Sequence, residues 1–287
     1  MMKYGTIVTG TVSDQNEEYY YVQYQGKTFA LDKSYCDDAL EVGDEVEGMI
    51  YETKSGQAVI QLDLPDIRPG YYGWGQVVDQ HHDLGVFVDV GLEDKDVVVS
   101  LDDLPDQHFL WPKKGDWLYL TFEADDRNRF WGQLADEAAM QDLFRKASPK
   151  IMNNEYNFVI YQLKLAGSLA ISRPEGYRAF LHESERFEEP RLGQTVKGRI
   201  IDVKKNGEVN ISLKPRAHEV IGEDAQMILT LLEMSPTGSL ALHDKSSPED
   251  IQRELSISKG QFKRAVGQLL KEGKITQTIP EGIALKK

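Results

Sequence analysis

The sequence reads Val42-Gly43-Asp44-Glu45-Val46 near its start, and related segments recur as Lys114-Gly115-Asp116-Trp117-Leu118 and Leu192-Gly193-Gln194-Thr195-Val196. Their glycines lie 72 and then 78 residues apart. Each glycine is followed, 19 or 20 residues later, by a leucine with a polar residue before it, at Leu62, Leu134 and Leu213. Self-similarity at a nearly constant period is typical of repeated domains. We therefore predict three copies of one small domain.

Each copy ends in two segments in which apolar residues alternate with polar ones. The first segments carry Val46, Gly48 and Ile50; Leu118, Leu120 and Phe122; and Val196, Gly198 and Ile200. The second segments carry Ala58, Ile60 and Leu62; Phe130, Gly132 and Leu134; and Val209, Ile211 and Leu213. A period of two predicts strands with one buried face, so each pair of segments forms a hairpin. In copy three, Asn206-Gly207 predicts a two-residue turn with positive φ at both residues.

Further short strands with glycine at their bends precede each hairpin, as at 85–91 in copy two. Five short antiparallel strands per copy favour a small closed barrel, because closure leaves no exposed edge. Residues 135–146 predict a connecting helix that ends before Pro149. After residue 214 the apolar period becomes helical, and Ser247-Pro248 and Ser258-x-x-Gln261 are typical starts of helices.

The predicted fold class is mainly β and multidomain: three tandem OB-fold-like β-barrels followed by an α/β domain. The expected boundaries are barrel 1 at 1–64, barrel 2 at 65–134, a linker helix at 135–154, barrel 3 at 155–214 and the last domain at 215–287.

Composition restricts the class of protein. The 287 residues include one cysteine, Cys36, which excludes a disulfide framework and a thiolate zinc cluster. No apolar run approaches the ~18 residues that span a bilayer, and no apolar stretch follows the N-terminal charge as in a signal peptide. We therefore expect a cytoplasmic protein with no membrane partner.

The net charge of −14 is unevenly distributed. Residues 1–64 hold 4 basic and 12 acidic side chains, and residues 65–134 hold 6 and 14. Residues 155–214 hold 10 basic and 8 acidic side chains, and residues 215–287 hold 10 of each. If a nucleic acid binds, the C-terminal half is therefore expected to supply most of the phosphate contacts.

Copy two resembles the S1 RNA-binding domain, a relative of the OB-fold. The resemblance rests on Gly75-x-Val77, Leu84-Gly85-Val86-Phe87-Val88, Val99-Ser100, Lys114-Gly115-Asp116, Asp125-x-x-x-Arg129 and Leu134. Copy three is similar through Phe180-Leu181-His182-Glu183-Ser184 and Asn210-Ile211-Ser212-Leu213, and copy one mainly through Tyr21 and its last hairpin. The resemblance implies binding of single-stranded RNA on one face of the barrel.

Transferred by position, the resemblance assigns different parts of the family's site to each copy. Copy two keeps Phe87, Asp125 and Arg129, with Leu84 in place of an aromatic residue and Val98 in place of a histidine. Copy three keeps His182 and Asp202, with Leu169 in place of an aromatic residue and Glu208 in place of the arginine. No copy holds the full set, which favours binding that is spread over several domains.

The last domain resembles the winged-helix domain. In its final helix Phe262, Ala265, Val266 and Leu269 share one face, opposite Arg264, Gly267, Gln268 and Lys271, with Lys263 on the flank. This polar face is expected to contact nucleic acid, to pack on the preceding barrel, or to be solvated. Three S1-like barrels followed by a winged helix resemble the conserved virulence factor B family of Gram-positive bacteria. That resemblance implies a non-catalytic RNA-binding regulator of gene expression.

Phe87 also stands out without the resemblance. Val86, Val88 and Val90 form the buried set of their strand, so Phe87 points to the other face. There it is a candidate platform for stacking of a base, or else it packs against a neighbouring domain. The candidate RNA-binding residues are Phe87, Asp125, Arg129, Arg178, His182, Lys197, Arg199, Asp202, Lys204, Lys205, Lys263, Arg264, Gln268 and Lys271.

Nothing in the sequence indicates catalysis. His81-His82-Asp83 has poor spacing for a metal, acidic pairs at turns such as Asp125-Asp126 are ordinary solvated residues, and no Gly-x-x-x-x-Gly-Lys-Ser/Thr occurs. We expect no catalytic residue, metal or cofactor. Two alternatives to RNA binding remain open: a regulator that binds duplex DNA through the winged helix, and an adaptor that uses the acidic N-terminal half to bind a ribosomal or other basic protein surface.

Overall fold

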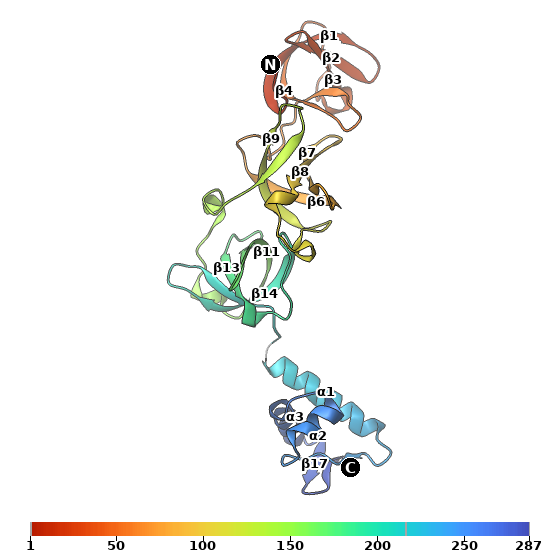
Figure 1. Ribbon diagram of the computed structural model, residues 1–287, viewed down its shortest axis with the longest axis vertical. Coiled ribbons are helices and arrows are strands. Elements are labelled where there is room, and N and C mark those ends of the chain that lie inside the picture. Colours follow the sequence, from red (N-terminus) through yellow and green to blue (C-terminus); the bar gives the residue numbers. More distant parts are fainter. Residues whose placement is uncertain (1, 216, 287) are drawn as a thin grey trace. The chain divides into compact units, whose positions relative to one another are not determined.

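The computed structural model describes residues 2–215 and 217–286, which belong to two compact units, Met1–Leu213 and Lys214–Lys287. The N-terminal unit contains three closed five-stranded barrels, which follow one another along the chain (Figure 1). The C-terminal unit contains three helices and a three-stranded sheet. The predicted fold class, three OB-like barrels followed by a winged helix, is confirmed.

The strands of the barrels coincide with the alternating segments of the sequence. Barrel 1 consists of β1 (Thr6–Gln15), β2 (Tyr19–Tyr24), β3 (Lys27–Asp32), β4 (Glu45–Glu52) and β5 (Ala58–Gln61). Barrel 2 consists of β6 (Gly73–His81), β7 (Gly85–Leu92), β8 (Lys95–Ser100), β9 (Trp117–Ala124) and β10 (Phe130–Leu134). Barrel 3 consists of β11 (Glu155–Lys164), β12 (Gly167–Ser172), β13 (Arg178–His182), β14 (Thr195–Val203) and β15 (Val209–Ser212).

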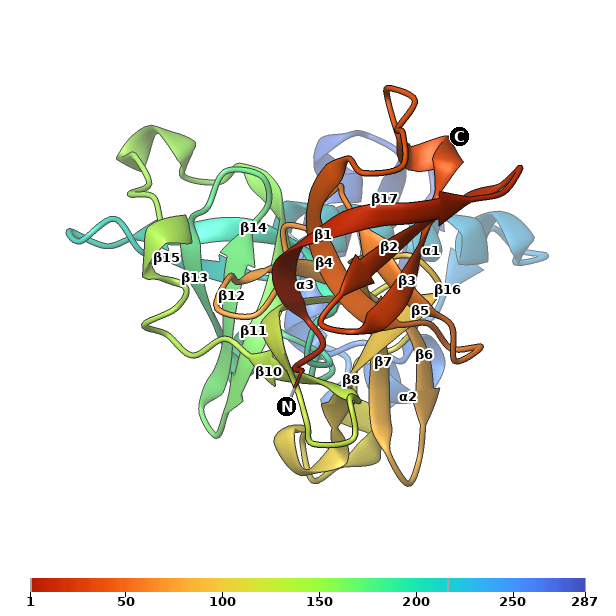
Figure 2. The same ribbon diagram turned by 90° about the horizontal axis from the view of Figure 1, so that it is seen from above.

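Each barrel closes through one parallel strand pair, which the expectation of purely antiparallel strands missed. The first barrel runs β1-β2-β3-β5-β4 and returns to β1, as Figure 2 shows from above. The third and fifth strands of every barrel are parallel, and the other pairs are antiparallel. A ring with an odd number of strands cannot alternate direction throughout, so one parallel pair is unavoidable.

The two-residue turn predicted from Asn206-Gly207 in copy three is not formed, and the last hairpins of all three barrels have a longer turn. The turn in barrel 3 has three residues, closed by hydrogen bonds from Lys204 N to Glu208 O (2.8 Å) and from Gly207 N to Lys204 O (2.9 Å). Only Gly207 has positive φ, at 87°. Barrels 1 and 2 repeat this geometry with Gly56 (φ 86°) and Asn128 (φ 59°). A three-residue loop ending in a left-handed residue is the next most common hairpin connection.

The predicted linker helix is wrong. Residues 137–140 form turns and Gln141–Leu143 a single 3₁₀ turn, after which the chain runs extended to a second 3₁₀ turn at Pro149–Ile151. The backbone of this stretch forms short turns up to Phe144 and then bonds to barrel 3, from Arg145 N to Gly176 O (2.8 Å) and from Ala147 N to Gly207 O (3.0 Å). Helical propensity over the twelve residues 135–146 is weak because so short a helix is only marginally stable by itself, so these tertiary hydrogen bonds override it.

The C-terminal unit follows the helix signals of the sequence. It consists of α1 (Ala217–Met234), β16 (Ser239–Leu240), α2 (Pro248–Leu255), α3 (Lys259–Lys271), β17 (Ile275–Thr278) and β18 (Gly282–Leu285). Ser247 caps α2, and Ser258 and Gln261 form the predicted capping box of α3. Phe262, Ala265, Val266 and Leu269 are at most 1% exposed, which confirms the buried face of α3. Over the two described stretches, no helix is both long and apolar enough to span a bilayer.

Gly85 begins β7 at a point where the backbone passes directly over β8. Its φ is +131°, and a Cβ built there would lie 2.0 Å from the carbonyl oxygen of Val99. Gly167 stands at the same register position in barrel 3, with Leu181 O at 2.2 Å from a built Cβ. These two glycines therefore permit the close crossing of the second and third strands.

Replacing Gly85 by alanine is therefore expected to destabilise barrel 2 by several kcal/mol, roughly 3 or more, because both the backbone angle and the contact with Val99 O are unfavourable. Gly115→Ala is the control, since its φ is +94° but no atom lies within 4 Å of a built Cβ; we expect a loss of only about 1–2 kcal/mol. Tryptophan fluorescence during urea unfolding measures the difference, because Trp74, Trp111, Trp117 and Trp131 all lie in this barrel. Equal losses in the two variants would contradict the close-crossing argument.

Candidate nucleic-acid interface

A row of side chains crosses the outer face of barrel 2. The strand register places Asp79 opposite Phe87, Phe87 opposite Val98, and Val98 beside Trp131. The residues before and after Phe87, Val98 and Trp131 along their strands are buried, whereas these three are half-buried. Since successive residues of a strand point to opposite faces, the row faces outwards. Barrel 2 therefore presents two aromatic rings with a small valine between them.

Asp125 holds the two ends of the last turn of barrel 2 together. Its carboxylate accepts hydrogen bonds from the backbone N–H groups of Arg127 (2.8 Å) and Arg129 (2.9 Å). It also accepts from the Arg129 side chain, with Nε at 2.8 Å, and from the indole Nε1 of Trp131 at 3.1 Å. The Arg129 guanidinium lies 5.3 Å from the Trp131 ring centre. The predicted pair Asp125–Arg129 therefore orients the outward-facing Trp131.

These hydrogen bonds change the acidity of Asp125. The backbone N–H of Arg129 makes the largest contribution and, with Trp131 and the Arg129 side chain, holds the pKa of Asp125 well below its ordinary value of 3.8. The carboxylate therefore stays ionised throughout the neutral and mildly acidic range.

The equivalent turn positions carry different pairs in the other barrels. In barrel 3 they are Lys204 and Glu208, which form an ion pair at 3.5 Å with the signs of Asp125 and Arg129 reversed. In barrel 1 they are the neutral Thr53 and Gln57, joined by a bond from Gln57 N to the threonine hydroxyl (3.1 Å). Asp202, which the resemblance aligned with Asp125, lies instead opposite Asn210 within the strands, where it accepts a weak hydrogen bond of 3.4 Å.

Barrel 3 presents a single aromatic ring in the equivalent row. The register joins Gln162, Leu169, Phe180, Asn210 and Asp202. His182 does not belong to this row, because it lies opposite Gly167 just as Ser100 lies opposite Gly85.

His182 instead caps the next 3₁₀ turn: its Nδ1 accepts the backbone N–H of Ser184 at 3.1 Å. Its ring lies 6.1 Å from that of Phe180 in an edge-on arrangement. His182 therefore corresponds in position to Ser100 of barrel 2, and Phe180 corresponds to Val98. The resemblance had aligned His182 with Val98, which is two residues out of register.

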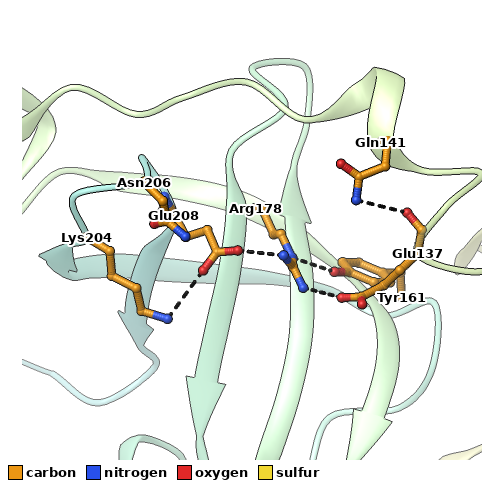
Figure 3. Close-up of polar contacts among 7 residues, drawn as sticks. All are labelled: Glu137, Gln141, Tyr161, Arg178, Lys204, Asn206 and Glu208. Atoms are coloured by element: carbon orange, nitrogen blue, oxygen red, sulfur yellow. Dashed lines mark hydrogen bonds and ion pairs between the residues drawn. The ribbon is translucent and has the colours of Figure 1, made fainter.

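Arg178 connects barrel 3 to the segment that precedes it (Figure 3). Its guanidinium forms ion pairs with Glu137 of that segment and with Glu208 of barrel 3, the latter at 2.5 Å. Its Nε lies 3.4 Å from the hydroxyl of Tyr161, and its guanidinium is 5.4 Å from the ring centre of Phe144. Two carboxylates thus balance this charge, so the structure gives Arg178 a positioning role between linker and barrel.

Other basic candidates of barrel 3 also have acidic neighbours. Lys197 pairs with Glu155 at 2.7 Å, and Lys204 with Glu208 as described. Arg199 is half-buried, and Lys205 is exposed at the last turn. Two of the basic candidates of copy three, Lys197 and Lys204, therefore already have an acidic partner within the barrel.

The outer row of barrel 1 is partly covered by barrel 2. It consists of Asp14, Tyr21, Ala30, Val59 and Tyr51. Tyr51 is 1% exposed, and its hydroxyl lies 3.0 Å from the carbonyl oxygen of Glu93, in the β7–β8 turn of barrel 2.

Further contacts join the same two surfaces. Lys54 N donates to Asp94 O at 2.9 Å, and the Lys54 ammonium pairs with Asp96 at 2.6 Å. Burial is the main cause of the raised pKa of Tyr51. In barrel 1 this end of the row is therefore an interface within the chain.

The outer face of α3 is polar and open within the C-terminal unit. Lys263, Arg264 and Lys271 are exposed, whereas Gln268 is half-buried and donates to Glu272 at 2.8 Å. A Cβ at Gly267 would meet no atom within 4 Å. This face thus keeps its cationic side chains available for a ligand.

Sequence reasoning missed Trp131 and Phe180. Both lie between buried residues of a strand, Trp131 between Phe130 and Gly132 and Phe180 between Ala179 and Leu181. The alternation that identifies Phe87 as outward-facing applies to both of them as well.

The part of the chain that the structure describes brings together no group of three or more metal-ligating side chains. The ring of His82 stacks on that of His108 at 4.9 Å, and the His108 ring lies 4.3 Å from that of Trp111.

Comparison with known proteins covers nearly the whole chain. Residues 4–60 match the S1 domain, 72–133 the CvfB first S1-like domain, 140–215 the second domain of virulence regulatory factor CvfB, and 226–285 the CvfB-like winged helix domain.

Curated relatives match at similar identity. The uncharacterized protein YitL of Bacillus subtilis is 40% identical over 276 residues, which is 96% of this chain and 92% of that protein. Conserved virulence factor B of Staphylococcus epidermidis is 40% identical over 250 residues, 84% of this chain and 83% of that protein. A crystal structure of a multidomain protein with nucleic acid binding domains from Streptococcus pneumoniae is 42% identical, with a TM-score of 0.73 over 99% of this chain and 98% of that one.

Three S1-like barrels and a winged helix make this chain a multidomain protein built from domain classes that bind nucleic acids. The chain belongs to the conserved virulence factor B family.

The lowered pKa of Asp125 predicts the pH dependence of the turn. A carboxylate with a lowered pKa in the folded state contributes stability that is present above its ordinary value of 3.8 and is lost as pH falls through the folded pKa. The indole N–H resonance of Trp131 should therefore stay constant from neutral pH to about pH 4 and shift only in more acidic solution. In Asp125→Asn this acid shift should be absent. A midpoint near 3.8 in the unmodified chain would show that the hydrogen bonds to Asp125 do not form in solution.

Proposed function

We propose that the chain is a cytoplasmic protein that binds single-stranded RNA and regulates gene expression after transcription, with barrel 2 as its main stacking site. The observation that carries this proposal is the row in which Phe87 and Trp131 flank Val98, with Arg129 beside Trp131. Single-stranded nucleic acids bind to aromatic side chains on barrel faces through stacking, which contributes about 1–3 kcal/mol per base.

The geometry of the row favours single strands over duplexes. Phe87 and Trp131 lie on strands β7 and β10, which are two strand spacings or roughly 10 Å apart. Rings on an exposed sheet face can receive only bases that are splayed out of a helix, as in single-stranded segments and loops. The regulatory part of the proposal is supported by the family's description as a virulence regulatory factor.

The charges of the domains indicate which of them contact the RNA phosphates. Barrel 2 is strongly acidic, so it contributes stacking more than attraction for phosphates. Four exposed cations of the C-terminal half fit phosphate contacts: Lys205 of barrel 3 and Lys263, Arg264 and Lys271 of α3. The C-terminal half is therefore the proposed source of charge, and barrel 2 is the proposed stacking site, as its Phe87 already suggested in the sequence.

A second candidate function is binding of duplex DNA. The open cationic face of α3 favours it, because winged-helix relatives insert this helix into a major groove. In that case duplex DNA would bind more tightly than single-stranded RNA at the same salt concentration, and substitutions in the barrel 2 row would have no effect.

Phe87→Ala and Trp131→Ala should each weaken binding of a labelled oligouridylate by about tenfold, because each removes one stacking surface. Fluorescence anisotropy at fixed salt measures the affinity. Phe109→Ala is the matched control: its ring is 67% exposed on the same barrel but lies outside the row. The proposal fails if the row variants bind as tightly as the Phe109→Ala protein.

Lys263→Ala combined with Arg264→Ala should make the salt dependence of RNA binding shallower. Each phosphate contact of a single strand adds ~0.7 to the slope of log affinity against log salt, so the loss of two contacts lowers the slope by about 1.4. The control is Lys245→Ala combined with Arg253→Ala, which removes the same charge from exposed positions outside α3. Equal slopes for the two double variants would show that α3 does not touch the RNA.

A further inference from the structure

A groove with a volume of about 720 Å³ lies at the junction of barrels 2 and 3. One wall comes from residues 103–107 and 110 of barrel 2 and from residues 134–137, where the linker begins. The other comes from residues 161–165 at the end of β11 and from Glu189 and Leu192. Its volume falls within the range of sites that hold ligands or peptide side chains.

The groove has an apolar part beside its polar one. Its lining includes Leu104, Leu110, Leu134, Leu163, Leu165 and Leu192. Leu165 is 100% exposed in the turn between β11 and β12, so its side chain is covered by no part of the described chain. Covering such a side chain is favourable by about 25 cal/mol per Å² of apolar surface, so a partner with an apolar side chain would gain from contact here.

The edge of the groove is acidic. Five carboxylates line it, of which Glu137 pairs with Arg178 and Glu189 with Arg186. Asp103, Asp106 and Asp136 form no ion pair within the described residues, and Lys164 is the only basic side chain in the lining. These three carboxylates repel phosphates and attract cations, which disfavours RNA as an occupant.

The walls of the groove are held in place by contacts between the barrels. Leu192 N donates to Leu110 O at 3.0 Å, and both residues line the groove. Beside them Arg191 pairs with Asp116 at 3.2 Å.

An arginine of barrel 3 strengthens the same junction. The Arg173 guanidinium lies 4.7 Å from the ring centre of Trp74 and 4.4 Å from that of Trp117 in barrel 2. A preformed groove reduces the ordering that binding requires.

We propose that this groove binds a short cationic peptide segment of a partner protein. An aliphatic side chain of the segment packs against Leu163 and Leu165, and flanking lysine or arginine side chains pair with Asp103, Asp106 and Asp136. This interaction goes beyond RNA binding and does not depend on it. It gives the acidic part of the chain a partner whose charge complements its own.

The probe is a labelled short peptide of alternating lysine and leucine, measured by fluorescence anisotropy on the full chain. Two variants address the groove without disturbing the core: Asp106→Lys, whose side chain is exposed, and Leu165→Ser. Each should weaken binding by about fivefold, through lost charge attraction in the first and lost apolar contact in the second. Asp83→Lys is the matched control, an exposed acidic side chain of barrel 2 outside the groove, and it should bind like the unmodified chain.

Two comparison peptides test the chemistry of the occupant. A lysine–glycine peptide lacks the apolar side chains and a glutamate–leucine peptide lacks the positive charge, so both should bind more weakly than the lysine–leucine peptide. Tryptophan fluorescence checks that barrel 2 remains folded in every variant.

Several results would overturn the proposal. These are no saturable binding of the lysine–leucine peptide up to about 1 mM, equal binding by the groove and control variants, or equal binding of the lysine–glycine peptide. Displacement of the peptide by oligouridylate from an unmodified groove, with no effect of the barrel 2 row variants on that displacement, would identify RNA as the occupant instead. A change in oligomeric state confined to Leu165→Ser would identify a second copy of this chain.

Discussion

The parallel pairing of the third and fifth strands is the constraint on which each barrel depends. Five strands cannot close into a ring by antiparallel pairs alone, and in barrel 2 the pair that lies parallel is β8 with β10. This pairing brings Trp131 beside Val98 and thereby into line with Phe87. It also places the turn containing Asp125 at the end of that row. The candidate stacking site is thus a direct consequence of how the barrel closes.

The three barrels close in the same way, but the side chains of their outer rows and last turns differ, and so do their contacts. In barrel 2 the row is aromatic and open, and an Asp–Arg pair orients one of its rings. In barrel 3 the equivalent pair, Lys204 and Glu208, has the opposite arrangement of charges. Arg178 there forms ion pairs with one carboxylate of the linker and one of the barrel. In barrel 1 the end of the row packs against the β7–β8 turn. Barrel 2 is therefore the candidate binding domain, barrel 3 is joined to the linker by ion pairs, and barrel 1 packs against barrel 2.

Much of the fold could be predicted from patterns along the chain. The alternation around Val86 and Val88 identified both the buried face of β7 and the outward direction of Phe87, and Ser258 with Gln261 marked the start of α3. The candidate site was predicted less well. Asp125 and Arg129 do form a pair, and Phe87 lies in the same row as Trp131, which contacts both. Trp131 and Phe180 were missed, however, and His182 was placed two residues out of register. A spacing in sequence cannot show which residues become neighbours across strands.

The sequence by itself determined the number of domains, their class and the outward-facing residues of each strand, because these depend on periods of two or 3.6 residues that are local to the chain. Tertiary structure decided the rest. In place of the expected linker helix it formed turns, two short 3₁₀ segments and an extended stretch that bonds to Gly176 and Gly207 of barrel 3. It also covered one end of the row of barrel 1, paired Arg178, Lys197 and Lys204 with carboxylates, and formed the groove between barrels 2 and 3. Each of these outcomes depends on residues far apart in sequence, whose contacts no local pattern records.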